Sequence, residues 1–284
     1  MSPVMEEIRL SLPHIELAAH VSGPEDGVPV IALHGWLDNA NSFARLAPKL
    51  PGLRIVALDF AGHGHSDHRP RGAGYALADY AFDVLCVAEQ LGWERFALMG
   101  HSLGAIVAVM IAGSFPDRVT RLALIDGIVP KSGPGADTAE HMGNALQAQL
   151  HHQHKRKSVH PTLDRAVAAR MKGMVAVSQE AAELLAQRGL MPVPGGYSWR
   201  SDSRLTLPSP LRLSAEQGMS FVRRVTCPTT LVVAEEGMLA SYTDLLERLP
   251  FSQVRVPGGH HVHLNDEAGA ILVADCFKRF FSAS

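Results

Sequence analysis

Residues 100–104 of this chain read Gly-His-Ser-Leu-Gly and lie between two apolar runs. The preceding run, residues 96–99, predicts a buried strand, and the following run, residues 105–112, predicts a buried helix. A sharp strand-to-helix turn with a glycine on either side strains the central serine and exposes its hydroxyl group. The helix N-terminus also favours negative charge developing beside it. The pattern therefore predicts that Ser102 is a nucleophile at the edge of a sheet.

Apolar runs recur along the chain in a way that is typical of a parallel sheet. Besides residues 96–99, the predicted strands cover residues 28–33, 54–58, 121–125, 229–234 and 253–256. Their continuous apolar character suits strands that are buried on both faces. Helical patterns cover residues 42–50, 76–91, 103–114 and 266–281, and residues 8–21 resemble a hairpin around Pro13. The alternation predicts an α/β fold with helices on both faces of the sheet.

Residues 130–210 interrupt this alternation, because they contain no convincing core strand. Helical patterns near residues 138–152, 161–175 and 178–188 are followed by a loop at 191–210 that is rich in Pro, Gly and Ser. We interpret the segment as a helical cap over the carboxyl ends of the strands, where open α/β sheets bind ligands. The predicted organisation is a core of residues 1–129, a cap of residues 130–210 and a second part of the core, residues 211–284.

A serine hydroxyl is a weak nucleophile unless a base accepts its proton. His260 is the favoured base, because it directly follows two glycines, comes after the last predicted strand and precedes the terminal helix. His261 and His263 lie nearby and are alternatives. General-base assistance by such a residue typically contributes about 10²–10⁴ in rate.

The negative oxygen of a tetrahedral intermediate also requires hydrogen-bond donors. The backbone N–H of Leu103, directly after the predicted nucleophile, is the first candidate, and that of Trp36, in the loop after residues 28–33, is the second. His34, Gly35 and His101 flank these positions, and we expect them to contact the substrate.

The acid that orients the base should lie between Ser102 and His260 in the sequence. The usual place, the loop after residues 229–234, contains Glu235 and Glu236 but no Asp. Asp126 follows the preceding predicted strand and can point into the same cleft. We favour Asp126, with Glu236 and then Glu235 as alternatives.

The overall composition narrows the function classes. The chain has 284 residues, 46% hydrophobic residues and a formal net charge of −2, which suits a globular core and argues against general binding of nucleic acid or membrane surfaces. Three widely spaced cysteines predict neither a disulfide framework nor a zinc site. We see no signal peptide or membrane span, and we expect a cytoplasmic monomer or small homo-oligomer that acts on a small-molecule substrate without cofactor or metal.

Four stretches give the chain a resemblance to the α/β-hydrolase superfamily over nearly its whole length. They are His-Gly-Trp at 34–36, Asp-Phe-Ala-Gly-His-Gly-His-Ser at 59–66, the serine turn at 100–104 and Gly-His at 259–260. Residues 34–43 and 256–263 are also similar to the serine hydrolase-like proteins, a branch of that superfamily. The resemblance implies an eight-stranded, mostly parallel sheet with a helical cap, and hydrolysis of an ester-like bond through an acyl-enzyme.

The acid departs from the superfamily pattern, because Met238 stands where typical members carry Asp. Asp126 matches the acid position of some relatives, such as the haloalkane dehalogenases. Those relatives use Asp as the nucleophile, so dehalogenation and epoxide opening are disfavoured here. We expect hydrolysis of a small or medium ester. The alternatives are hydrolysis of a C–C bond, lactone or thioester, acyl transfer, and ligand binding with little turnover.

Overall fold

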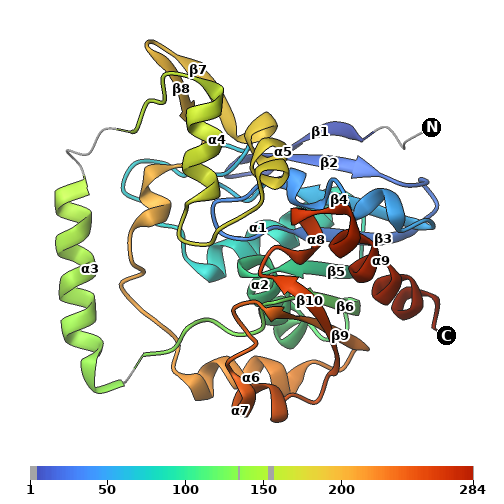
Figure 1. Cartoon of the computed structure of the whole chain (residues 1–284). Helices are drawn as coiled ribbons and strands as arrows, with labels where there is room; N and C mark the ends of the chain where they lie inside the picture. Colours follow the sequence, from blue (N-terminus) through green and yellow to red (C-terminus); the bar gives the residue numbers. More distant parts are fainter. Residues whose placement is uncertain (1–4, 134, 153–156, 284) are drawn as a thin grey trace.

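An eight-stranded sheet forms the centre of the protein. We describe it from a computed structural model that covers residues 5–133, 135–152 and 157–283 (Figure 1). The strand order is β1-β2-β4-β3-β5-β6-β9-β10, and β2 runs antiparallel to both of its neighbours while the strands from β4 to β10 are parallel. The strands are β1 (Glu6–Ser11), β2 (Glu16–Ser22), β3 (Val28–Leu33), β4 (Leu53–Leu58), β5 (Phe96–His101), β6 (Val119–Ile125), β9 (Thr229–Glu236) and β10 (Ser252–Gly259). The predicted N-terminal hairpin and mostly parallel sheet are confirmed.

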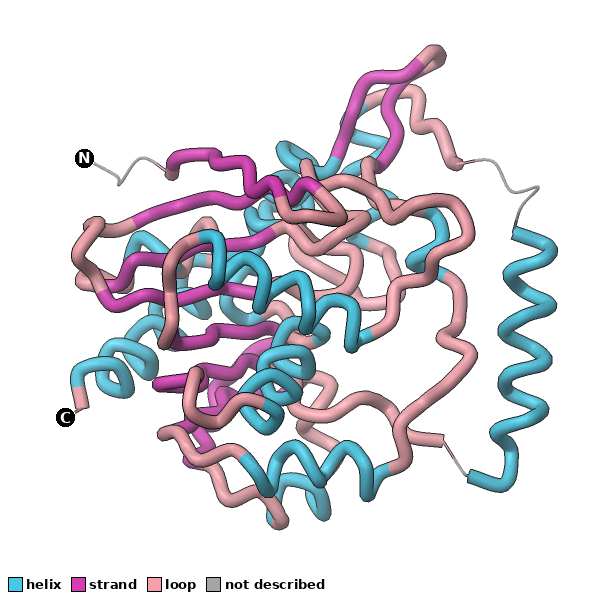
Figure 2. Tube along the Cα trace, turned by 180° about the vertical axis from the view of Figure 1, so that it is seen from behind, coloured by secondary structure: helices cyan, strands magenta, loops and turns pink. Residues whose placement is uncertain are grey.

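Helices cover both faces of this sheet, as the opposite views of Figures 1 and 2 show. One apolar cluster joins the sheet to helices α1 (Leu77–Gln90), α2 (Leu103–Ser114) and α6 (Ala215–Arg224). A second cluster joins the other face to α9 (Glu267–Ser282) and to two short turns of 3₁₀-helix, Ala40–Phe43 and Ala47–Lys49. Because both faces of β3, β5, β6 and β9 are covered, their continuous apolar sequences are explained. The prediction of a strand buried on both faces is wrong for residues 253–256, because β10 lies at the edge of the sheet and is largely exposed.

Some local predictions differ from the structure. The helix predicted at residues 42–50 is two separate 3₁₀ turns. Pro48, which lies at the start of the second turn, has no N–H to donate and would interrupt an α-helix. The sequence interpretation also missed α6 and the two short helices α7 (Thr243–Glu247) and α8 (Val262–Asn265).

Residues 130–210, which we call the insert, contribute no strand to the eight-stranded sheet in their described part. Their helices are α3 (Thr138–His152), α4 (Leu163–Met171) and α5 (Gln179–Gly189). The predicted loop at 191–210 is wrong in part, because β7 (Leu190–Val193) and β8 (Gly196–Trp199) pair antiparallel there. Gly195 in the connection and Gly196 at the start of β8 adopt positive φ angles, which explains how so short a connection turns the chain.

The parts of the insert differ in how they meet the rest of the protein. Helices α4 and α5 share an apolar cluster with Leu264 of α8. Helix α3 stands apart from the sheet in both views and has one buried residue, Ala145 (Figures 1 and 2).

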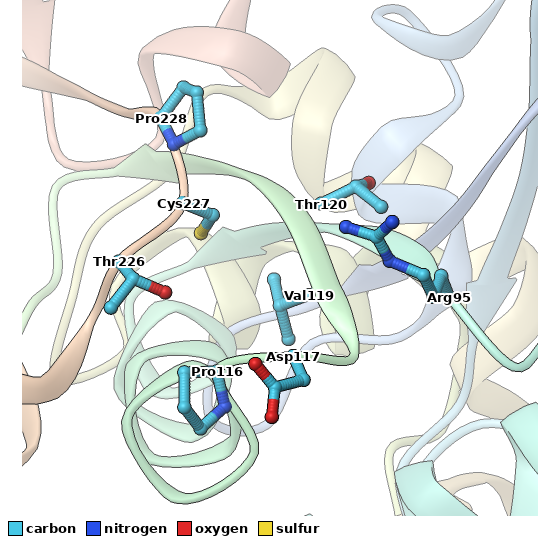
Figure 3. A pocket seen from close by; sticks show the side chains of 8 residues that line it. All are labelled: Arg95, Pro116, Asp117, Val119, Thr120, Thr226, Cys227 and Pro228. Carbon is cyan, nitrogen blue, oxygen red and sulfur yellow. The ribbon is translucent and has the colours of Figure 1, made fainter.

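A hollow of about 520 Å³ lies at the amino ends of β6 and β9 (Figure 3). Arg95, Asp117 and Cys227 are among the residues that line it. Ser102 follows the carboxyl end of β5, whereas this hollow lies at the amino ends of the parallel strands. The hollow and the predicted nucleophile are therefore at opposite ends of the strands. No helix in the described part of the chain is long and apolar enough to span a membrane.

Candidate active site

Ser102 lies at the sharp turn between β5 and α2. Its φ and ψ angles are 52° and −114°, a strained conformation for a residue other than glycine. Its N–H donates to the carbonyl of Ile125 at 3.0 Å, which ties the turn to the neighbouring strand β6. A Cβ atom on Gly104 would lie 2.0 Å from Leu33 O, and one on Gly100 would lie 2.5 Å from Gly104 O. The two glycines are therefore required for the close approach of strand and helix.

The structure brings His260 and Asp126 together. The Nδ1–H of His260 donates to Asp126 Oδ2 at 2.5 Å, and both side chains are buried. Asp126 directly follows β6 and has a positive φ of 44°, which Asp tolerates better than most residues. Because Nδ1 is the donor in this pair, Nε2 is the nitrogen that remains free to accept a proton.

The loop after β9 contacts the Asp126 carboxylate through its backbone. Met238 N–H donates to Asp126 Oδ2 at 2.7 Å, and Leu239 N–H donates to Oδ1 at 3.4 Å. A Cβ atom on Gly237 would lie 2.4 Å from the same carboxylate, so glycine allows the loop to close over it. Met238 thus contributes its backbone amide to the support of Asp126.

The alternative acids, Glu235 and Glu236, are exposed at the end of β9. The alternative bases are also occupied elsewhere: His261 Nε2 pairs with Asp38, and His263 Nε2 pairs with the hydroxyl of Ser42. Within the described residues, no hydrogen bond joins the Ser102 hydroxyl to His260. Such catalytic hydrogen bonds are often long in the unliganded enzyme and tighten when substrate binds.

The predicted oxyanion donors occupy two turns beside Ser102. Leu103 is the first residue of α2, so its N–H has no acceptor within the helix. Residues 35–38 form a tight turn in which Asp38 N–H donates to Gly35 O at 3.1 Å and Leu37 has a φ of 62°. Trp36 is the first central residue of this turn, and its indole N–H donates to Leu205 O at 2.8 Å.

His34 and His101 are fully buried, although the sequence interpretation expected them to contact the substrate. His34 donates from Nδ1 to Gly35 O at 2.7 Å and accepts the Phe60 N–H at Nε2, which satisfies both nitrogens of a neutral ring. His101 donates from Nε2 to the His260 carbonyl at 2.9 Å. Burial lowers the pKa of both imidazoles. The two rings therefore hold backbone segments of the site in place.

Gly35, the third residue expected to contact the substrate, is also buried. A Cβ atom there would lie 2.9 Å from His101 Nδ1 and 3.0 Å from Asp38 Oδ2. Glycine at this position leaves room for those two side chains.

A buried charged cluster that the sequence interpretation missed lies behind the site. Asp38 accepts hydrogen bonds from His261 Nε2 at 2.9 Å and from Arg170 Nη2 at 2.8 Å, and its Oδ2 lies 3.8 Å from His101 Nδ1. Burial alone would raise the pKa of Asp38, but the neighbouring His261 and Arg170 outweigh burial and hold that pKa well below its ordinary value. The sequence offered one indication of this cluster, the position of Asp38 two residues after Trp36. It did not indicate the partner Arg170, which lies 132 residues away.

Asp38, His101 and His261 also form the one metal-like group found among the described residues, with ligand atoms within 4.8 Å of one another. The guanidinium group of Arg170 already neutralises the single carboxylate of this group and would repel a cation. The donor set therefore fits an internal ion pair better than a metal site.

Comparisons with known proteins agree with this architecture. A family model described as the alpha/beta hydrolase fold matches residues 28–267. A serine hydrolase-like protein of Danio rerio is 33% identical over 97% of this chain and 89% of its own length. The crystal structure of a hypothetical protein from Pseudomonas aeruginosa PAO1 is 65% identical with a TM-score of 0.96, covering 98% of this chain and 100% of the other. A thioesterase domain from the curacin biosynthetic pathway is 25% identical with a TM-score of 0.82, covering 96% and 99%.

Proposed function

We propose that this chain, which belongs to the α/β-hydrolase family and is similar to its serine hydrolase-like branch, cleaves small or medium carboxylic esters through an acyl-enzyme. The observation that carries the proposal is the 2.5 Å hydrogen bond between His260 and Asp126, beside the strained turn of Ser102. An ionised carboxylate that fixes one imidazole nitrogen leaves the other to act as a base.

The proposed mechanism uses these side chains in sequence. The Ser102 hydroxyl attacks the ester carbonyl while His260 Nε2 accepts its proton, and Asp126 stabilises the resulting imidazolium. The N–H groups of Leu103 and Trp36 stabilise the tetrahedral oxyanion, where loss of one donor typically costs about 2.7–4 kcal/mol. His260 then gives its proton to the departing alkoxide. It next activates a water molecule that releases the acid and regenerates Ser102.

The nature of the nucleophile supports acyl chemistry over related reactions. Dehalogenation and epoxide opening proceed in similar folds through a carboxylate nucleophile, whereas this chain carries a serine hydroxyl at the turn. The lack of an Asp after β9 motivates the alternative of a binding protein on a hydrolase fold, and the hydrogen bond between Asp126 and His260 argues against that alternative.

The test compares the wild-type chain with Ser102→Ala on p-nitrophenyl acetate and butyrate. We expect wild-type turnover, its loss in Ser102→Ala, and covalent labelling of Ser102 by a fluorophosphonate. Ser220→Ala is the matched control, because Ser220 is an exposed serine on α6. Turnover that survives in Ser102→Ala would disprove the proposal. A folded wild type that binds ligands but forms no product and resists labelling would favour the binding-protein alternative.

Thioester hydrolysis is the second candidate, and the likeness to the curacin thioesterase domain favours it. The same nucleophile, base and oxyanion donors can act in the hydrolysis of an ester and of a thioester. Comparing kcat/KM for p-nitrophenyl butyrate with that for a butyryl thioester of N-acetylcysteamine, which has the same acyl group, separates the two. A lactone and a C–C bond substrate extend this panel to the remaining acyl reactions.

A further inference from the structure

Asp38 joins three separate parts of the protein. Its backbone closes the turn that carries Trp36, because Asp38 N–H donates to Gly35 O at 3.1 Å. Its carboxylate accepts a hydrogen bond from His261, the residue directly after the candidate base. The same carboxylate accepts from Arg170, which lies on α4 of the insert. Asp38 is therefore the point where the oxyanion turn, the base loop and the insert meet.

Arg170 is placed to fix this junction. Its Nη2 donates to Asp38 Oδ1 at 2.8 Å, and its Nη1 donates to Val175 O at 3.0 Å, so the guanidinium group is held by the insert at one end. The Asp38 side chain is fully shielded from solvent, and a buried carboxylate keeps its charge only with partners of this kind.

The histidines extend the junction to the reacting groups. His101 lies 3.8 Å from Asp38 through Nδ1 and supports the His260 carbonyl through Nε2. His261 Nε2 lies 2.9 Å from Asp38. A shift of Asp38 would therefore displace the base loop from one side and the turn of Trp36 from the other.

We propose that Arg170 is a positioning residue that acts through Asp38 to hold the oxyanion turn and the base loop in their working geometry. This inference rests on the proposed function for its kinetic consequences, but the structural coupling is independent of it. Arg170 itself does not touch the reacting atoms. Its effect is to set the distance between the donor at Trp36 and the base at His260.

Loss of Arg170 should also change the pH dependence. The arginine is one of the groups that keep the pKa of Asp38 low, so its removal raises that pKa, and protonation of Asp38 then weakens the junction at higher pH. The acid limb of kcat/KM should move to higher pH. The titratable or charged groups around Asp38 are Arg170 from α4, His101 from β5, His261 after β10 and His263 from α8, and, at longer range, His34 and His63.

The experiment compares Arg170→Met, Arg170→Lys and the matched control Arg165→Met, which changes an exposed arginine on the same helix. For Arg170→Met we expect kcat on p-nitrophenyl butyrate to fall about 10- to 100-fold, the size of loss expected when reacting groups are misplaced by about 1 Å. We expect KM to change little, Arg170→Lys to recover much of the loss, and Arg165→Met to match wild type. Equal kcat and equal pH profiles for the two methionine variants would overturn the inference.

Hydrogen–deuterium exchange supplies a readout that does not require turnover. Peptides covering residues 34–39 and 259–263 should exchange faster in Arg170→Met than in Arg165→Met, while β3 and β5 remain unchanged. Unchanged exchange in both peptides would refute the coupling even if activity fell. If the wild type is inert to esters and fluorophosphonate but this exchange pattern is present, the proposed function fails and the positioning role stands.

Discussion

Replacing Asp126 by Asn is a direct test of the site, because the structure shows what the substitution removes. Asp126 Oδ2 accepts from both His260 Nδ1 and Met238 N, at 2.5 and 2.7 Å, whereas Oδ1 accepts only from Leu239 N at 3.4 Å. An Asn that places its side-chain oxygen where Oδ2 stands keeps the hydrogen bonds from His260 and from Met238. Its NH₂ group then faces only the long contact with Leu239. The tautomer of His260 is preserved, and the main loss is the negative charge.

The size of the effect follows from that charge. Two opposite unit charges about 4 Å apart attract by about 4 kcal/mol at an effective dielectric constant of about 20. Each loss of about 1.4 kcal/mol in transition-state stabilisation costs a factor of about ten in rate. We therefore expect kcat of Asp126→Asn to fall about 1,000-fold. KM should change little, because Asp126 is 2% exposed and is therefore shielded from a bound substrate.

The assay is the steady-state hydrolysis of p-nitrophenyl butyrate, with kcat and KM measured separately. Glu236→Gln is the matched control, since it removes a carboxylate that is exposed at the end of β9. We expect that control to retain wild-type kcat. An Asp126→Asn variant with more than a tenth of the wild-type kcat would refute this reasoning. A loss in Glu236→Gln with Asp126→Asn active would move the acid to the later loop.

Three further substitutions test how the site is supported. Gly104→Ala should lower the melting temperature or prevent folding, because its Cβ would lie 2.0 Å from Leu33 O, and overpacking typically costs about 1–3 kcal/mol and occasionally more. Arg188→Met should lower the free energy of unfolding in urea by about 3–5 kcal/mol, because it leaves the buried carboxylate of Asp59 without its 2.8 Å partner. Burial holds the pKa of His263 at about 3, below its ordinary 6.5, so the unfolded chain binds the proton first and stability falls as the pH drops from 6.5 towards 3. His263→Gln should reduce that slope, measured by urea unfolding between pH 7 and 5, by up to about 1.4 kcal/mol per pH unit.

Each of these substitutions has a control or a contrary outcome. Gly143→Ala adds a methyl group on exposed helix α3, where nothing lies within 4 Å, and should not reduce stability. Arg223→Met breaks an exposed pair with Glu216, which is worth less than about 1 kcal/mol. If Arg223→Met destabilises the protein as much as Arg188→Met does, burial of the Arg188–Asp59 pair is not the cause of the loss. If the free energy of unfolding depends on pH equally in His263→Gln and in wild type, the folded and unfolded states bind the His263 proton equally, which contradicts the prediction.

The parts of the site that are local in sequence could be predicted from it. The turn around Ser102 requires only a strand, a helix and two glycines within five residues, and the histidine loop requires only its place after the last strand. Asp126 could be selected because chain order and strand ends limit the possible positions. The amide support from Met238 could not, because it depends on how the loop closes over a side chain 112 residues away.

The remaining differences have two physical origins, one local in the sequence and one in distant contacts. The predicted helix at residues 42–50 contains the right apolar spacing, but Pro48 would interrupt an α-helix there, and the Asn39 side chain caps a turn that already begins at Ala40. His34 and His101, which we expected to contact the substrate, are buried because they form hydrogen bonds with residues in distant loops. Periodicity predicts which face of an element is buried, but it does not predict which polar groups meet there.

Helix α3 has a consequence for how proteins of this architecture can diverge. Because Ala145 is its one buried residue, most substitutions along α3 remove little packing and cost little stability. Helices α4 and α5, by contrast, carry Arg170 and Arg188, whose carboxylate partners are buried in the core. Natural variation and laboratory evolution can therefore explore the sequence of α3 with few folding failures. Changes in α4 and α5 must preserve two ion pairs, and we expect libraries randomised there to yield far fewer folded proteins.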